Sequence, residues 1–417
     1  MLMQRSRSAR LVLVLTTAAL AMTACSSSSG GSAGGTTGGD HGLKGSPILL
    51  GNVVDMTGPI PGLFKGAREA TEAYVEKINS TGGLNGHPVK LVEGDSQTTC
   101  NGASQAWGKV MPQVQAMVGS ISGLDSCIDK VLNANPKIPA VFEILNPVLS
   151  GIPNTFSPSP RPLGQSVGAY KWISEQNPGA IEHIGYIANK VTEFSYIQLI
   201  GGMKAIGGKV AYTRTTDVTK QTDFTSDIIK MKQNGVQWLT LDGLPVDTVN
   251  RILNNAKQQN WHPKVITAAT AYDGNFFKIA DPAAAEGVYI PLAQALFLGE
   301  DSSQSPGVAE YLKYLKIAHP DAVPDIFGAF AWSSMELWYQ AWQKAGGQKT
   351  PDDVTFALGT ITTFNAKGMV ADASPTARTP ATCWDVAQIK SGKYVRVMPT
   401  DKLYSCDGAQ FVPLKLG

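Results

Sequence analysis

Runs of apolar residues alternate along the chain with segments whose apolar positions recur at helical spacing. The first such unit begins with Ile48–Val54, a short apolar run that predicts a strand buried on both faces. Between Phe64 and Ile78, apolar residues recur every three or four positions, which predicts an amphipathic helix. Val89–Val92 predicts a second strand. Together these elements form a βαβ unit, whose crossover is right-handed almost without exception.

The same alternation continues through most of the chain. Seven further apolar runs predict strands: Gln115–Ser120, Ala140–Leu145, Ile184–Ala188, Lys209–Thr213, Trp238–Asp242, Lys264–Thr267 and Gly287–Ile290. Helical segments separate them, and two more helices are predicted over Pro306–His319 and Ile326–Ala345. Near the end, Thr382–Lys390 and Tyr394–Met398 flank a Ser-Gly pair and predict a hairpin. Strands that alternate with helices predict an α/β fold with parallel sheets.

The length of the chain predicts two lobes. About 390 residues follow the first 24, which is more than one hydrophobic core usually contains. A proline-rich segment between Asn146 and Gly164 predicts a first crossing from one lobe to the other, and we expect further crossings near Ile290–Leu292 and Gly368–Thr379. The first lobe is then expected to contain residues 46–158 plus 291–367, and the second residues 159–290 plus 368–417.

The N-terminal residues predict export from the cytoplasm. Three arginines precede the apolar run Leu11–Met22, which is too short to span a bilayer and has the flanks of a signal peptide. The tetrapeptide that ends in Cys25 resembles a bacterial lipobox, in which this cysteine receives the lipid; an ordinary cleaved signal is the alternative. Residues 25–45 are rich in Ser and Gly and predict a flexible tether. We therefore expect residues 1–24 to be removed and the protein to be lipid-anchored at the cell membrane, outside the cytoplasm.

Composition and charge agree with a folded, exported body. Apolar residues make up 43% of the chain and charged residues 16%, which permits a sizeable core and argues against disorder. Without the three arginines of residues 1–24, the chain has 32 basic and 33 acidic residues, a net charge of −1. Bulk charge therefore gives no reason to expect a nucleic-acid partner.

The cysteines point to disulfides. Four follow Cys25, and an even number in an exported chain favours disulfide bonds. Of the three possible pairings we expect Cys100 with Cys127 and Cys383 with Cys406, because each closes a short loop. A zinc site is the alternative, but the five histidines are scattered without ligand spacing and no C-x-x-C is present, so no metal is expected.

The opening unit indicates a family. A Thr-Gly-Pro turn after the first strand, a helix that begins near Lys65, and the segment INSTGGLNGHPVKLVEGDSQ closely resemble the opening of the type I periplasmic binding proteins of the leucine/isoleucine/valine-binding kind. The resemblance covers the chain from about Ser46 to the C-terminus. It implies two Rossmann-like lobes with parallel sheets joined by a multi-strand hinge. It also implies the ligand-capture subunit of an ABC importer, which binds a small polar, amino-acid-like ligand in the interlobe cleft and delivers it to membrane permease subunits.

In the relatives, loops at strand ends of the first lobe hold an amino-acid carboxylate through hydroxyls and backbone N–H groups. The matching loops here contain Ser122 and Gly123, and a glycine-containing turn at a helix start points free N–H groups at an anion. The alternative is that Ser122 only caps the helix that begins near Asp125. The candidate ligand contacts of the first lobe are Phe64, Ser122, Gly123, Glu143 and Leu145.

The second lobe departs from the relatives. They carry an aromatic residue at the position of Phe194, and near Thr270 an acid that pairs with the ligand ammonium. Since Thr270 cannot neutralise an ammonium, Asp242 and Asp273 are possible substitutes, with Tyr272 beside the latter. A helix cap for Asp242 and a turn position for Asp273 are the alternatives. The candidate contacts of the second lobe are Phe194, Asp242, Thr270, Tyr272 and Asp273.

The resemblance implies a monomer that is not an enzyme and carries no cofactor. Two other functions remain open: a ligand-sensing protein of the same fold without transport, and a surface hydrolase. Against the hydrolase, residues 119–123 have the sequence GSISG and not G-x-S-x-G, so the nucleophile elbow is absent. A metal-binding pair of histidines and a phosphate-binding loop are also missing from the sequence.

Overall fold

The computed structural model describes residues 36–37, 39–347 and 350–415. The predicted export signal, Cys25 and most of the predicted tether lie outside the described residues. None of the described helices has the length and apolar character needed to cross a membrane.

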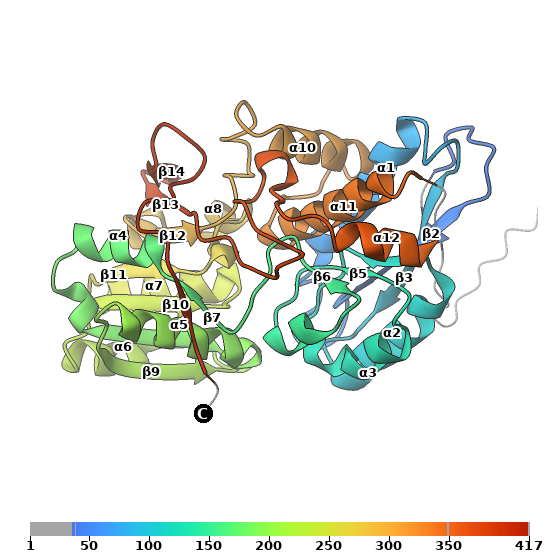
Figure 1. Ribbon diagram of the computed structural model, residues 1–417. Helices are drawn as coiled ribbons and strands as arrows, with labels where there is room; N and C mark the ends of the chain where they lie inside the picture. The colour runs from blue at the N-terminus through green and yellow to red at the C-terminus, as the bar shows by residue number, and fades with distance from the viewer. Residues whose placement is uncertain (1–35, 38, 348–349, 416–417) are drawn as a thin grey trace, which may run out of the picture. The chain divides into compact units, whose positions relative to one another are not determined.

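The first sheet has the strand order β1-β3-β2-β4-β5-β6, and Figure 1 labels its strands β2, β3, β5 and β6. Its strands are β1 (Thr36–Thr37), β2 (Ile48–Val54), β3 (Val89–Asp95), β4 (Ala116–Val118), β5 (Ala140–Val141) and β6 (Thr155–Phe156). The strands from β2 to β6 pair in parallel, and β1 pairs antiparallel with β3 at the edge. The predicted strand at Ile48–Val54 is therefore confirmed, and it lies inside the sheet as its apolar run requires.

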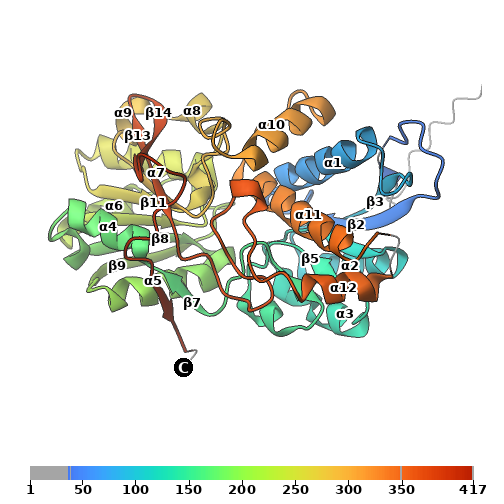
Figure 2. The ribbon, with the colours of Figure 1, turned by 45° about the horizontal axis from the view of Figure 1, so that its top comes forward.

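Helices cover both faces of this sheet. One face carries α2 (Cys100–Val110) and α3 (Asp129–Ala134), with the short helices η1 (Met111–Gln113), η2 (Asp125–Ile128) and η3 (Pro147–Gly151) around them. The other carries α1 (Lys65–Ser80), against which α10 (Pro306–Ala318) and α11 (Ile326–Lys344) pack, and α12 (Pro351–Leu358) packs on α11 (Figure 2). Trp332 of α11 is buried between the rings of Tyr74 and Tyr311, so this aromatic belongs to the core.

The second sheet has the order β14-β13-β12-β11-β10-β8-β9. Its strands are β8 (Ile184–Asn189), β9 (Val210–Thr216), β10 (Trp238–Asp242), β11 (Lys264–Thr267), β12 (Tyr289–Leu292), β13 (Asp385–Lys390) and β14 (Lys393–Met398). The strands from β8 to β12 are parallel. The predicted C-terminal hairpin is confirmed as β13–β14, and it extends this sheet by pairing antiparallel with β12.

Helices also cover both faces of the second sheet. The helices α4 (Gly168–Gln176) and α5 (Glu193–Ala205) share one apolar cluster with Tyr186 and Trp238 of the sheet. On the other face lie α6 (Thr225–Gln233), α7 (Val246–Gln258), α8 (Phe276–Ile279) and α9 (Pro282–Ala285). Short helices η4 (Ala180–Glu182), η5 (Lys190–Thr192) and η6 (Ala269–Ala271) complete the lobe. The predicted α/β class with two lobes and parallel sheets is confirmed.

Three segments of the described chain connect the lobes. One contains β7 (Gly164–Ser166), which pairs antiparallel with β15 (Phe411–Pro413) near the C-terminus. The second follows β12, and the third follows η7 (Ala366–Gly368); these two run side by side, since the N–H of Ala371 donates to the carbonyl of Ala293 at 2.8 Å. The exact bounds of the lobes remain a prediction.

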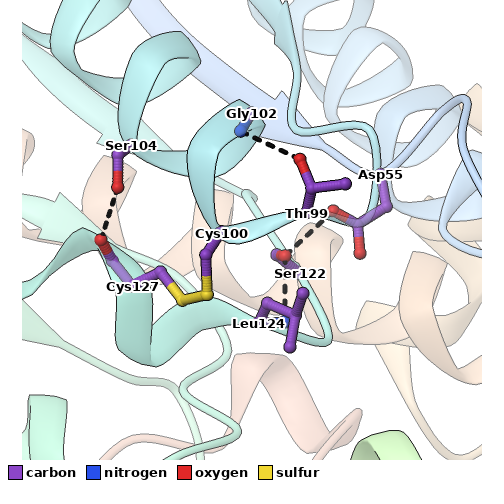
Figure 3. The surroundings of a disulfide bond; sticks show 8 residues. All are labelled: Asp55, Thr99, Cys100, Gly102, Ser104, Ser122, Leu124 and Cys127. Carbon is purple, nitrogen blue, oxygen red and sulfur yellow. Dashed lines mark hydrogen bonds between the residues drawn. A yellow bond between two sulfur atoms is a disulfide. The ribbon is translucent and has the colours of Figure 1, made fainter.

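Both predicted disulfide pairings are confirmed. Cys100 at the start of α2 is bonded to Cys127 in η2 (Figure 3), and Cys383 before β13 is bonded to Cys406 after β14. The bonds close loops with sequence separations of 27 and 23 residues. On the chain-entropy estimate each contributes about 3 kcal/mol to stability. The first bond tethers the loop that carries Ser122 and Gly123 to the adjoining helix.

Candidate ligand-binding site

A buried aspartate organises the strand ends of the first lobe. Asp55 follows β2 directly and its side chain is 0% exposed. Its carboxylate accepts hydrogen bonds from the Ser122 hydroxyl at 2.9 Å (Figure 3), from the Gly123 N–H at 3.1 Å and from the Ser96 hydroxyl. Burial raises the pKa of Asp55, and these hydrogen bonds oppose the rise.

Ser122 and Gly123 therefore hold a carboxylate, but it is the carboxylate of the chain itself. The oxygen of Ser122 also accepts the N–H of Leu124 at 3.1 Å, which stabilises the turn before η2. In this structure both predicted donors already have a protein partner. A ligand carboxylate would have to displace Asp55 or be bound by other donors.

A cavity of about 220 Å³ lies where the connecting segments meet the two lobes. Much of its wall is apolar and includes Leu145, Ala169, Tyr170, Leu292, Trp384 and Phe411. Polar side chains in the wall include Arg161, Gln165, Ser195, Gln198 and Gln294. An apolar wall with a few polar groups is the usual composition of a small-molecule site.

Arg161 brings a positive charge to this cavity. Its Nε lies 2.6 Å from Oε1 of Glu143, and its guanidinium carbon lies 5.4 Å from the centre of the Phe330 ring. Glu143 is only 1% exposed, and its pKa is raised to about 6 because burial outweighs the attraction of Arg161. Removing Arg161 alone would leave a buried carboxylate without its counter-ion.

Two further buried carboxyl groups lie near the cavity. Asp242 ends β10, and the hydroxyl of Ser195, which lines the cavity, hydrogen bonds to it. The Oδ2 atom of Asp242 is buried without a hydrogen-bond partner among the described residues. Asp125 of η2 accepts the N–H groups of Leu145 and Asn146 at 2.7 and 3.0 Å and so fixes the loop after β5. Burial raises the pKa of both aspartates to about 6.

Comparison with known proteins explains this arrangement of two lobes around a cavity. The periplasmic binding protein family matches residues 47–393 of the chain. The chain belongs to the periplasmic binding protein family. It is similar to "Leu/Ile/Val-binding protein homolog 1" of Brucella melitensis, with 23% identity over 315 residues that cover 75% of this chain and 82% of the relative.

Solved structures of other periplasmic binding proteins share the fold. A leucine-binding protein from Thermotoga maritima has a TM-score of 0.67 at 16% identity, and the match covers 84% of this chain and 97% of that one. A solute-binding protein of an ABC transporter from R. palustris, solved in complex with benzoate, has a TM-score of 0.69 at 16% identity; the match covers 89% and 98%.

The other predicted ligand contacts of this periplasmic binding protein differ in whether they line the cavity. Leu145 lines the cavity, whereas Phe64 is buried in the first lobe with its ring 4.6 Å from that of Phe327. Phe194 is half-buried in the first turn of α5, next to Ser195. The hydroxyl of Thr270 donates to the carbonyl of Leu244 at 3.2 Å, and the neighbouring Ala269 lines the cavity.

Tyr272 and Asp273 lie apart from the cavity wall. The ring of Tyr272 is fully buried against Phe297 and Tyr394, and its hydroxyl donates to Glu300 at 2.6 Å. The carboxylate of Asp273 accepts the N–H of Asn275 at 2.6 Å, the bond of a turn-forming aspartate. Among the ten predicted contacts, the structure brings Leu145, Glu143 and Asp242 to the surroundings of the cavity.

Sequence analysis missed Asp55, Arg161 and Ser195. A signal for Arg161 was present: it is the single charged residue of the proline-rich segment 146–164, which was expected to cross between the lobes. Asp55 also had a signal, because it directly follows a buried strand whose carboxyl end was expected to face the ligand. Ser195 adjoins the predicted Phe194.

Proposed function

We propose that this periplasmic binding protein captures a small polar, amino-acid-like solute between its two lobes and delivers it to the permease of an ABC importer. The observation that carries this proposal is the cavity, whose wall combines Leu145 of the first lobe, Ser195 of the second and Ala293 and Ala381 of the connecting segments. A solute that contacts both lobes stabilises their closed arrangement. The permease then distinguishes the loaded from the empty form. The names of the relatives support an amino-acid-like solute.

We also propose that the protein acts outside the cytoplasm, as a monomer that its lipidated Cys25 anchors to the membrane. The lipobox-like tetrapeptide supports the anchor, and the two disulfides in the described residues support an oxidising compartment. Replacement of Cys25 by Ala should release the protein from the membrane fraction. A Cys25→Ala protein that stays in that fraction after a high-salt wash would contradict lipid anchoring.

Binding without chemical conversion is the third part of the proposal. Ser122 is one of the two serines of residues 119–123, whose sequence GSISG departs from the hydrolase pattern. It donates to Asp55 and accepts the N–H of Leu124, so its contacts are those of a turn-stabilising hydroxyl. Ser122 is 4% exposed and Asp55 is 0% exposed, and neither lines the cavity, so a solute in the cavity does not reach this hydroxyl. Incubation of each binding solute with the protein should return it unchanged.

The experiment is a thermal-shift screen of the purified full-length protein, followed by small-angle scattering with every solute that binds. The screen covers amino acids, amides, ureas, polyols and organic acids. A ligand present at about a hundred times its dissociation constant adds about 2.7 kcal/mol of stability, which the melting temperature reports. The radius of gyration should fall on binding. A screen without any thermal shift, or binding without compaction, would contradict the proposed function.

A further inference from the structure

The hydrogen-bond donors at the strand ends of the first lobe are already bound within the protein. Ser122 and Gly123 of the first lobe, together with Ser96, are bound to the carboxylate of Asp55. Asp55 is fully buried, so these donors are satisfied inside the protein. A ligand carboxylate in the cavity therefore needs a different positively polarised group.

Arg161 supplies such a group. Among the described residues that line the cavity, it is the one with a charged side chain, and no aspartate or glutamate is among them. A guanidinium has five N–H donors in a planar fork. In the described structure only the Nε–H of Arg161 has a hydrogen-bond partner, the carboxylate of Glu143, and the side chain is 41% exposed. The terminal N–H groups are thus available for a carboxylate, which guanidinium groups bind in a bidentate manner.

A ligand ammonium has no comparable partner. Glu143 is bound to Arg161, and Asp125 is bound to two backbone N–H groups. The unpartnered oxygen of Asp242 is buried below the cavity wall, where Ser195 lies. A charged group that enters an apolar cavity without a partner loses its hydration and gains little in return.

We propose that the ligand is a small monocarboxylate with an apolar body and without an ammonium group, and that Arg161 binds its carboxylate. This inference rests on the proposed function and replaces its amino-acid-like solute with a carboxylate that lacks the ammonium group of an amino acid. The cavity volume of about 220 Å³ is below the 300–1,000 Å³ typical of sites for drug-sized ligands, so the body is on the order of one ring or a short alkyl chain. Asp55 and Arg161 then act together as specificity-determining residues.

The carboxyl groups around Arg161 should make the affinity for a ligand carboxylate depend on pH. Glu143, Asp125 and Asp242 are the carboxyl groups whose charge interacts with Arg161, and burial raises the pKa of each to about 6. Tyr170 lies in the same wall and remains neutral across this range because burial raises its pKa. As the pH falls from 8 to 5.5, the three carboxyl groups lose negative charge while a ligand carboxylate of pKa about 4 stays ionised. Affinity for a monocarboxylate should therefore rise as the pH falls, and affinity for a cation should fall.

Titration calorimetry on the full-length protein tests this with four matched probes: benzoate, benzamide, phenylalanine and benzylamine, with hexanoate and hexanamide as an alkyl pair. The carboxylates should bind at least about tenfold more tightly than their amides. The double variant Arg161→Gln with Glu143→Gln removes both charges without stranding a buried carboxylate. It should weaken carboxylate binding about ten- to a hundredfold and leave amide binding within about twofold.

A control variant has the same chemical changes at a distant ion pair. Arg251→Gln with Asp247→Asn breaks the pair on α7, in which Nη2 lies 2.7 Å from Oδ2, and should leave all affinities unchanged. Phenylalanine or leucine binding more tightly than the carboxylates, with the Arg161 double variant unaffected, would overturn the inference while the proposed function stands. Benzoate binding that weakens as the pH falls from 8 to 5.5 would overturn it as well. No binding by any probe or any solute of the screen would contradict both proposals.

Discussion

Each lobe has a buried aspartate at the carboxyl end of one of its parallel strands, and the two aspartates differ in their hydrogen bonding. Asp55 after β2 accepts three hydrogen bonds and leaves none of its donors free for a ligand. Asp242 at the end of β10 has one oxygen without a partner among the described residues, and the hydroxyls of Tyr186 and Thr267 on the same sheet are also unpartnered there. The carboxylate of Asp55 is thus satisfied internally, whereas Asp242 carries the cost of an incompletely bonded carboxyl group.

The difference in hydrogen bonding indicates that the two strand ends differ in rigidity. A fully bonded strand end is rigid and excludes other anions, because each donor would have to exchange one carboxylate for another. An incompletely bonded strand end can gain bonds when the lobes or a ligand rearrange. In this structure Asp55 therefore occupies the donors of the Ser122–Gly123 turn that a ligand carboxylate would otherwise use.

The largest effect is expected from loss of the disulfide that tethers the first lobe's strand-end loop. Cys100→Ser with Cys127→Ser opens the bond between α2 and η2 and should lower the free energy of unfolding by about 3 kcal/mol, because the unfolded chain gains entropy. Denaturant unfolding measures the loss. Cys383→Ser with Cys406→Ser, which opens a loop of similar length, is the control and should cost a similar amount. Only the first variant should alter the hydrogen-exchange protection of the Gly123 N–H. Equal protection in both variants would show that the Cys100–Cys127 bond does not restrain the loop that binds Asp55.

Removal of the internal carboxylate is the second prediction. Asp55→Ala leaves the Ser96 and Ser122 hydroxyls and the Gly123 N–H buried without their acceptor, and should cost about 2–3 kcal/mol. Acetate or formate should restore part of the melting temperature of this variant, since a small carboxylate fits where the side chain was removed. Wild type and Asp55→Asn, which keeps an acceptor oxygen, serve as controls and should not respond to acetate. Absence of rescue would show that these donors do not form an anion site.

The sequence was sufficient for the parts of this comparison that depend on local pattern. Long apolar runs such as those of β2 and β10 identify buried strands. The turn at Ser122 and Gly123 was predicted to hold a ligand carboxylate, and in the structure it holds the carboxylate of Asp55. The occupant of that loop could not be predicted, because Asp55 reaches it across 67 residues of sequence. Short strands such as β6 and β7 also escaped prediction, since a few residues carry no period and their pairing is set by tertiary contacts. Tyr272 was expected near the ligand, but its direction is set by packing on Phe297 and on Tyr394 of the distant hairpin.

The third prediction is that substitution of the buried aspartate of the second lobe, Asp242, stabilises the protein, whereas substitution of Asp55 in the first lobe destabilises it. The pKa of Asp242 is raised by burial to about 6 from 3.8, so the folded state binds the proton more tightly than the unfolded state. This contribution to stability is fully present below pH 3.8 and is lost as the pH rises through about 6. Asp242→Asn is neutral at every pH. It should therefore match the wild type at pH 4 and be more stable than the wild type by about 2–3 kcal/mol at pH 8.

Melting temperatures measured between pH 4 and pH 8 check this prediction. Asp217→Asn is the control with the opposite environment, because Asp217 is exposed and hydrogen bonds from Thr219 lower its pKa. Its variant should lose stability relative to the wild type as the pH rises. A difference between Asp242→Asn and the wild type that stays constant with pH would contradict the view that the second lobe carries a costly carboxyl group.

The smallest effect on stability is expected where the two lobes touch. A Cβ atom on Gly123 would lie 3.1 Å from Cγ1 of Val191 in η5, so the turn of the first lobe meets the second lobe at this glycine. The backbone of Gly123 does not require a positive φ, and Gly123→Ala should change the free energy of unfolding by less than about 0.5 kcal/mol. The added methyl group should instead oppose closure and weaken binding of the carboxylate probe about three- to tenfold. Val191→Ala in the same chain removes the crowding and should restore the affinity, because neighbouring substitutions of this kind are not additive. An affinity that the second substitution does not restore would place the effect of Gly123→Ala within the first lobe and not at the contact between the lobes.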